Sequence, residues 1–422
     1  MLIEVARQLG NEVDERWARK GYALDAFASV AADTIERLSP HDRFDLAEFA
    51  NWLAQTEDLP EQLDPRSRFG DPPITVWRTS RFVVDLYFWT TPETDLHDHG
   101  FTGAFTNLLG ESLHCVYRAG LVEEPEPGVM VTDLELPAVE LLVKGSIRPI
   151  LGGRRFIHRV THLSRPTVTL TVRTIDTGST FRQYSYLYPS IGIEVSDRLD
   201  EQNQLSRKRR RFLSFLATIG HLGLESYVKQ LVDRSDTRDA LKYIAKLNKD
   251  ADLHPLEHFG LLNRLLEQLE ARYGAWIDKF GSALEHQIKE GRVNWQQIHD
   301  VDQRFLAAVL LALPSRREVI ETIKRYRDPT DPVGWLVGRL QGMIEAEGLA
   351  VVINDFQFSV LRELILGRPE AEVVETALAG EGHGQSAGDL RGLCAALRKI
   401  DIFQPLFAAD SGHRGGLSWS GS

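Results

Sequence analysis

The chain has 422 residues, of which 43% are hydrophobic and 26% are charged, and its formal net charge is −11. This length predicts more than one domain, and the composition is that of a water-soluble globular protein. The negative charge argues against a protein that binds nucleic acid or an anionic membrane.

Three further features predict a cytoplasmic location. Cys115 and Cys394 are the only cysteines, too few for a disulfide scaffold or a cysteine-rich zinc site, and they fit a reducing compartment. The N-terminus lacks the charged and apolar regions of a secretion signal. The longest apolar run, Phe305 to Leu313, is far shorter than the roughly twenty residues of a membrane helix.

The first part of the chain, residues 1–60, predicts a helical lead-in. Apolar residues recur at spacings of two to four between Tyr22 and Leu38, as in an amphipathic helix. Ser39 followed by Pro40 is a typical helix start. We therefore expect a second helix to begin there and to run through Phe49.

Between residues 74 and 195 the pattern changes to short strands. Runs rich in valine, isoleucine, threonine and aromatic residues, such as 82–89, 113–117 and 167–174, alternate with glycine-containing turns. Many short strands at this spacing predict a sandwich or a barrel.

Helical patterns return near residue 206 and continue to about 407. The clearest stripe consists of leucines at 256, 261, 262, 265, 266 and 269, which predicts an all-helical domain over 206–407. Residues 408–422 are rich in glycine and serine and predict a flexible tail. The expected fold class is α+β and multidomain, with a central β-barrel between a helical lead-in and an all-α domain.

Three histidines in the strand region form a candidate metal site. His97 and His99 are two residues apart, so on a strand their side chains project from the same face. His158, about sixty residues later, could complete a three-nitrogen site from a neighbouring strand. Neutral imidazole is a common transition-metal ligand, and three facial ligands leave positions open for substrate and O₂. The alternative is a surface His-x-His pair and an unrelated core histidine.

The surrounding motifs decide between these interpretations. The chain contains, in order, an arginine before the aromatic-ended strand 82–89, then His97-Asp-His-Gly100, a turn at 108–110, His158-Arg-Val160 and the Pro-x-Val-x-Leu strand 166–170. In these motifs, residues 74–190 resemble the cysteine dioxygenase-type branch of the cupin superfamily.

The resemblance implies a small β-barrel that holds one Fe(II) through His97, His99 and His158. Many cupins add a glutamate shortly after the second histidine, but residues 101–107 contain no carboxylate, which fits the three-histidine arrangement of the thiol dioxygenases. In that branch an arginine holds the substrate carboxylate, a task that suits a bidentate guanidinium. Arg78 matches the position best, and Arg81 is the alternative.

Other positions depart from the family pattern. The cysteine that mammalian-type enzymes couple to a tyrosine would lie near Ala104, and the histidine expected after Asp176-Thr177 is missing. Tyr184 or Tyr186 could supply a hydroxyl group to the site instead. These differences weaken the case for cysteine itself as the substrate.

Asp95, His114 and His162 are additional polar residues of the strand region. Asp95 shares strand parity with His97, and His162 shares it with His158. Together with His114 they could surround the metal ligands as hydrogen-bond partners, form a second metal site, or be ordinary core and rim groups.

The predicted function is that of a non-heme Fe(II)-dependent dioxygenase or monooxygenase, which uses O₂ on a small organic substrate that bears a thiol or a carboxylate. One alternative is a cupin-fold hydroxylase, possibly with two irons, that acts on a bulky substrate in specialised metabolism. Another is a non-enzymatic ligand-binding cupin whose helical domain binds a partner protein. The sequence leaves the oligomeric state open.

Overall fold

The computed structural model of the chain describes residues 2–63, 70–92, 94–175, 180–195, 201–250, 255–380 and 385–408. Among these residues the chain divides into two units, one up to Glu285 and the other from His286 onwards. Each unit is described separately below.

The first unit begins with the helices α1 (Leu2–Ala18), α2 (Leu24–Leu38) and α3 (Leu46–Gln55). Ser39 has a left-handed backbone (φ 45°, ψ 56°) and ends α2, and a short 3₁₀ helix, Pro40–Arg43, follows it. The α-helix α3 starts only after Asp45, whose carboxylate accepts a hydrogen bond from the backbone N–H of Glu48 at 2.7 Å. The expected helix start at Ser39-Pro40 is therefore a 3₁₀ turn, and Asp45 is the residue that caps the helix.

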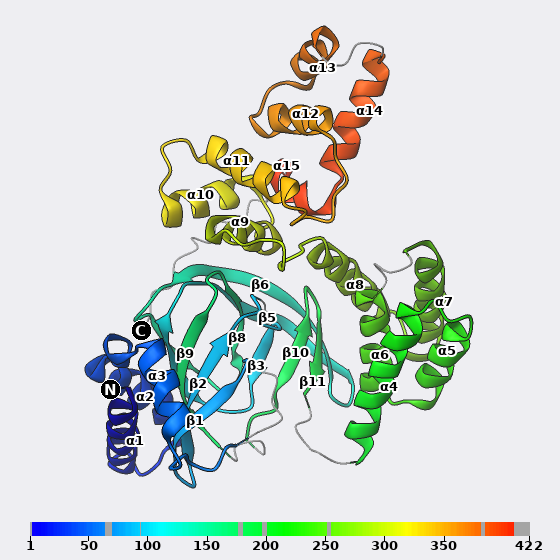
Figure 1. The fold of residues 1–422 in the computed structure, drawn as a ribbon. Helices are drawn as coiled ribbons and strands as arrows, with labels where there is room; N and C mark the ends of the chain where they lie inside the picture. Colours follow the sequence, from blue (N-terminus) through cyan, green and yellow to red (C-terminus); the bar gives the residue numbers. More distant parts are fainter. Residues whose placement is uncertain are drawn as a thin grey trace. The chain divides into compact units, whose positions relative to one another are not determined.

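A five-stranded antiparallel sheet packs against these helices (Figure 1). Its strand order is β1 (Pro73–Arg78), β2 (Phe82–Trp89), β9 (Thr167–Thr174), β4 (Gly103–Leu109) and β7 (Ile147–Ile150). Because side chains alternate between the faces of a sheet, Leu86 and Leu170 join the core beneath α1 and α2. Tyr87 and Thr171, on the other face, line an interior cavity.

The remaining strands close into a six-stranded barrel. Their order is β10 (Tyr184–Leu187), β11 (Ile191–Glu194), β6 (Val129–Leu142), β5 (Ser112–Glu126), β8 (Gly153–His162) and β3 (His97–His99). The short strand β3 pairs with β8 on one side and with β10 on the other. The expected α+β class, with a β-barrel and helical flanks, is confirmed.

The first unit continues with helices that pack on the barrel. These are α4 (Glu201–Thr218), α5 (Leu224–Arg234), α6 (Thr237–Lys249) and α7 (Pro255–Tyr273), followed by α8 (Ile277–Gly291), within which the two units divide. One buried apolar cluster joins these helices to Val129 and Val131 of β6 and to Ile191 and Ile193 of β11.

The second unit is helical. It contains α9 (Val301–Ala312), α10 (Arg316–Arg327), α11 (Pro332–Glu345), α12 (Asp355–Ile365), α13 (Glu370–Ala379), α14 (Ala387–Arg398), the 3₁₀ helix η3 (Asp401–Phe403) and α15 (Gln404–Phe407). The predicted helical segment 206–407 thus contributes helices to both units, and the predicted tail lies outside the described residues except for Ala408. Over the described ranges, no helix has both the length and the apolar character needed to cross a membrane.

Candidate metal centre

The three histidines of the predicted site meet on the adjacent strands β3 and β8. His97 is paired directly with His158 in the sheet register, and His99 projects from the same face of β3 as His97. The ring centroids are 4.7 Å apart for His97 and His99, and each lies 4.8 Å from that of His158. Within the described part of the chain, these buried residues are the one group of three or more histidine, cysteine or acidic side chains placed to hold a metal ion.

The nitrogen atoms of this cluster fit a metal ion. Nδ1 of His97 lies 2.7 Å from the backbone carbonyl oxygen of Asp95; since a carbonyl only accepts, Nδ1 carries the proton and Nε2 of the neutral ring carries the lone pair. Nδ1 of His99 and Nε2 of His158 are buried and have no hydrogen-bond partner. Buried polar atoms are rarely left in this state, and a bound cation would satisfy them.

Burial also keeps the three imidazoles neutral. It lowers the pKa of His97 and holds the pKa values of His99 and His158 well below the ordinary value for histidine, because the charged form loses its hydration. Metal ligation requires the unprotonated ring. The cluster is therefore suited to a transition-metal ion bound through three neutral nitrogen atoms.

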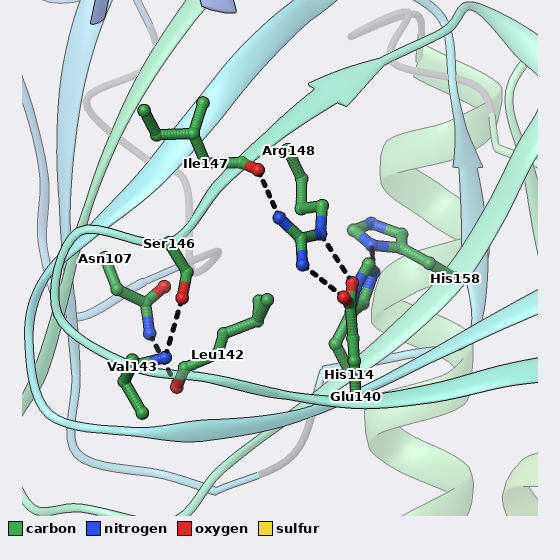
Figure 2. Close-up of polar contacts among 9 residues, drawn as sticks. All are labelled: Asn107, His114, Glu140, Leu142, Val143, Ser146, Ile147, Arg148 and His158. Carbon is green, nitrogen blue, oxygen red and sulfur yellow. Dashed lines mark hydrogen bonds and ion pairs between the residues drawn. The ribbon is translucent and has the colours of Figure 1, made fainter. Parts of the chain in front are cut away.

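A chain of hydrogen bonds runs from His158 away from the cluster (Figure 2). Nε2 of His114 lies 2.9 Å from Nδ1 of His158, and Nδ1 of His114 lies 2.7 Å from the carboxylate of Glu140. That carboxylate also accepts a 2.7 Å hydrogen bond from Nε of Arg148 and pairs with Nη2 of the same residue. We refer to His114, Glu140 and Arg148 as the relay.

The relay fixes which nitrogen of His158 is available to bind a metal ion. Burial alone would raise the pKa of Glu140, but hydrogen bonds from Arg148 and His114 lower it to about 2, so the carboxylate is ionised. It can only accept, so Nδ1 of His114 donates. Burial lowers the pKa of His114 and keeps the ring neutral, so its Nε2 accepts from Nδ1 of His158. Nε2 of His158 consequently carries a lone pair, as a ligand must.

A cavity of about 60 Å³ opens beside the three histidines. Besides these, the lining residues are aromatic, apolar or hydroxyl-bearing, with one further histidine: Tyr87, Trp89, Thr94, Phe101, Phe105, Ile150, Val160, His162, Thr169 and Thr171. Because a water molecule needs about 10–15 Å³ of such space, the cavity holds roughly four to six waters. It is sized for a small molecule.

His162 is a polar group of the cavity wall. Its ring stacks on Trp89 with 4.4 Å between centroids and 22° between planes, and its Nδ1 lies 3.0 Å from the hydroxyl oxygen of Ser112. Its Nε2 is buried without a hydrogen-bond partner, and burial lowers its pKa to about 3. Neither His162 nor His114 belongs to the three-ligand cluster; His114 supports a ligand, and His162 lines the cavity.

The side chain of Asp95 does not enter the site. It is exposed, and the residue contributes only its backbone carbonyl, which accepts from His97.

Arg78 and Arg81 lie away from the cavity. Nη1 of Arg78 forms a 3.0 Å ion pair with Glu61, and the guanidinium group of Arg81 lies 4.1 Å from the centre of the Tyr22 ring. Neither arginine lines the cavity.

Tyr184 and Tyr186 flank Ser185, which is the register partner of His97. Directly paired residues project from the same face of a sheet, so both tyrosines project from the opposite face. The hydroxyl of Tyr186 donates to the carboxylate of Asp98 at 2.8 Å, and the backbone N–H of Tyr184 donates to the same group at 2.6 Å. These contacts hold β3 in place, and the structure brings neither tyrosine to the cavity.

The sequence did not indicate the buried pair of Asp85 and Arg173. Nε of Arg173 donates to Asp85 at 2.9 Å, and Asp85 also accepts from the hydroxyls of Thr75 at 2.7 Å and Tyr87 at 3.3 Å. Arg173 shares strand parity with Thr169 and Thr171, and this spacing in the sequence could have indicated that all three side chains project from the same face of the strand. Glu140 and Arg148 carried no such signal, because their meeting depends on how β6 and β7 are placed in space.

Comparison with known proteins adds little to this geometry. No protein-family model matches the chain, and no curated protein matches it in sequence. One solved structure that matches is the crystal structure of TT1209 from Thermus thermophilus, at 23% identity over 28% of this chain and 97% of that one, with a TM-score of 0.18. A similarity this low carries no argument. The closed barrel with three buried histidines is compatible with a cupin-like fold.

Proposed function

We propose that the protein is a non-heme Fe(II)-dependent oxygenase that uses O₂ on a small organic substrate. The observation that carries this proposal is the buried cluster of His97, His99 and His158, in which two buried nitrogen atoms have no hydrogen-bond partner. Three neutral imidazoles occupy one side of a metal ion and leave other positions open. The resemblance of residues 74–190 to the cysteine dioxygenase-type cupins supports iron as that metal.

When bound, iron would supply redox chemistry with O₂ and a Lewis-acid centre for the substrate. The protein residues supply the rest. Neutral ligands leave the charge of the metal uncompensated, which favours a substrate group that ionises, such as a thiol or an enol. The relay keeps the proton of His158 on Nδ1, and Trp89, Phe101 and Phe105 give the cavity an aromatic wall.

The size of the cavity supports a small substrate over a bulky one. A volume of about 60 Å³ beside the histidines leaves room for only a few non-hydrogen atoms. A two-iron hydroxylase would need a second cluster of ligands. Among the described residues, the histidine cluster is the single group of this kind. The mononuclear enzyme is therefore the proposal that these observations favour.

The test uses alanine variants and a matched histidine control. His97→Ala and His158→Ala should each lose both iron, measured by elemental analysis, and O₂ uptake in the presence of small thiols. His221→Ala removes an exposed histidine whose Nδ1 accepts a hydrogen bond from the backbone N–H of Gly223 and should retain both. Full iron content in either ligand variant would contradict the site, and an iron-loaded wild type that consumes no O₂ with any thiol or carbonyl substrate would contradict the oxygenase activity.

A further inference from the structure

Among the residues that the structure describes, those that line the cavity beside the metal centre include no lysine, arginine, aspartate or glutamate. The arginines expected to bind a substrate carboxylate, Arg78 and Arg81, are engaged elsewhere, with Glu61 and Tyr22. A carboxylate placed against these side chains, away from the metal, would therefore have to leave water without gaining an opposite charge, which is unfavourable.

The buried arginine on a cavity strand does not change this conclusion. The guanidinium group of Arg173 lies 5.3 Å from the ring of Phe101, a lining residue that also packs on His99. Its charge is already compensated, because Asp85 accepts its Nε–H at 2.9 Å and the side chain of Asp85 is only 3% exposed. Asp85 is in turn held by the hydroxyls of Thr75 and Tyr87. Releasing Arg173 to a substrate would leave Asp85 buried and unpaired, which is strongly unfavourable.

The wall of the cavity offers a ligand a nitrogen atom of His162. Nε2 of His162 is buried and has no hydrogen-bond partner, whereas the other ring nitrogen is bonded to Ser112. Stacking on Trp89 fixes the plane of the ring. Other polar groups of the wall are already engaged with the protein: Nε1 of Trp89 donates to Thr169, and the hydroxyl of Thr94 donates to the carbonyl of Val160.

We propose that this cavity selects a small substrate that is uncharged apart from the group that binds the metal, and that Nε2 of His162 forms a hydrogen bond with that substrate. The inference rests on the proposed function, because it concerns the same site. It assigns the substrate class by charge: amides, alcohols or carbonyl compounds fit, and amino acids or other carboxylates do not. A buried, neutral imidazole provides a hydrogen bond without a charge that could pair with a carboxylate.

The test compares two thiols of the same shape that differ in charge. The Fe(II)-loaded protein is titrated without oxygen, at neutral pH, with 2-mercaptoacetamide and with 2-mercaptoacetate, and the dissociation constants are measured by calorimetry. We expect the amide to bind at least tenfold more tightly. Equal or tighter binding of the carboxylate, or no measurable binding of the amide, would overturn the inference.

Three variants separate the contributions of the residues. His162→Phe keeps the aromatic stack and removes the hydrogen bond, so the amide should bind about three- to tenfold more weakly while iron content stays unchanged. Asp85→Asn leaves the charge of Arg173 uncompensated and should shift the preference at least tenfold towards the carboxylate. Arg78→Gln is the control, and it should leave both constants within twofold of wild type. A loss of mercaptoacetate binding in Arg78→Gln would show instead that Arg78 is the carboxylate anchor.

The results distinguish this inference from the proposed function. A protein that prefers the amide but consumes no O₂ supports the cavity selectivity and contradicts the oxygenase. A protein that consumes O₂ but binds mercaptoacetate as tightly as the amide contradicts the selectivity alone. The comparison of the two thiols uses the wild-type protein alone, so its outcome does not depend on whether the variants fold.

Discussion

Replacing Glu140 by Gln should weaken the binding of iron although Glu140 does not touch the metal. The carboxylate of Glu140 accepts from His114, and this fixes the direction of every hydrogen bond up to His158. A glutamine side chain can also donate through its amide group. If it donates to Nδ1 of His114, the proton of that ring moves to Nε2, His158 must accept at Nδ1, and Nε2 of His158 then carries a proton in place of the ligand lone pair.

The size of the effect follows from the position and burial of Glu140. Its side chain is 14% exposed and that of Arg148 is 24% exposed, so water is a poor substitute for the lost acceptor. Removal of groups that orient metal ligands typically lowers metal affinity about 10- to 100-fold, which corresponds to about 1.4–2.7 kcal/mol. We expect Glu140→Gln to fall in this range.

The assay is an anaerobic competition for Fe(II) with a coloured chelator. Glu135→Gln is the matched control, because Glu135 lies on the same strand and is exposed, and its replacement removes the same charge. Since Glu140→Gln also leaves Arg148 without its carboxylate, the unfolding of both metal-free variants should be measured in parallel. An iron affinity of Glu140→Gln within twofold of both wild type and the control would show that the relay does not act on the metal centre.

Three further predictions concern stability. Tyr186→Phe removes the hydrogen bond to Asp98 and should lower the free energy of unfolding by about 1–3 kcal/mol, as measured by urea denaturation; a change under about 0.3 kcal/mol would contradict the role given to this contact. Because burial lowers the pKa of His162 to about 3 in the folded protein, its contribution to stability is complete above the unfolded pKa of about 6.5 and is lost as the pH falls towards 3. Between pH 6 and pH 5, the free energy of unfolding of metal-free His162→Phe should therefore fall by about 1 kcal/mol less than that of metal-free wild type. The same pH dependence in both proteins, measured by denaturant titration at each pH, would be inconsistent with a buried, neutral His162. Removing iron with a chelator should lower the melting temperature, and Fe(II) at about 100 times its dissociation constant should restore about 2.7 kcal/mol; a melting temperature independent of iron would argue against a site formed in the folded state.

The metal cluster was predictable because it depends on short-range rules. The two-residue spacing of His97 and His99 places both on one face wherever β3 lies, and strands β2 and β9 have the bounds that their β-forming runs predicted. Only the pairing of β3 with β8 had to be supplied by the fold.

The surrounding groups were less predictable because they depend on register and on side-chain direction. Tyr184 and Tyr186 have a common parity, but Ser185 is the residue that pairs with His97, so the tyrosines project away from the cavity. Arg78 stands at a strand end, where its long side chain reaches Glu61. The relay joins β5, β6 and β7, and no local pattern in the sequence records which residues of three strands will meet.

X-ray absorption spectroscopy of the protein loaded with Fe(II) tests the metal assignment most directly. We expect a first coordination sphere with three imidazole nitrogens in wild type, and the loss of one imidazole in His158→Ala wherever residual iron remains. A sphere with fewer than three imidazoles, or one with carboxylate ligands from the protein, would contradict the assignment of His97, His99 and His158.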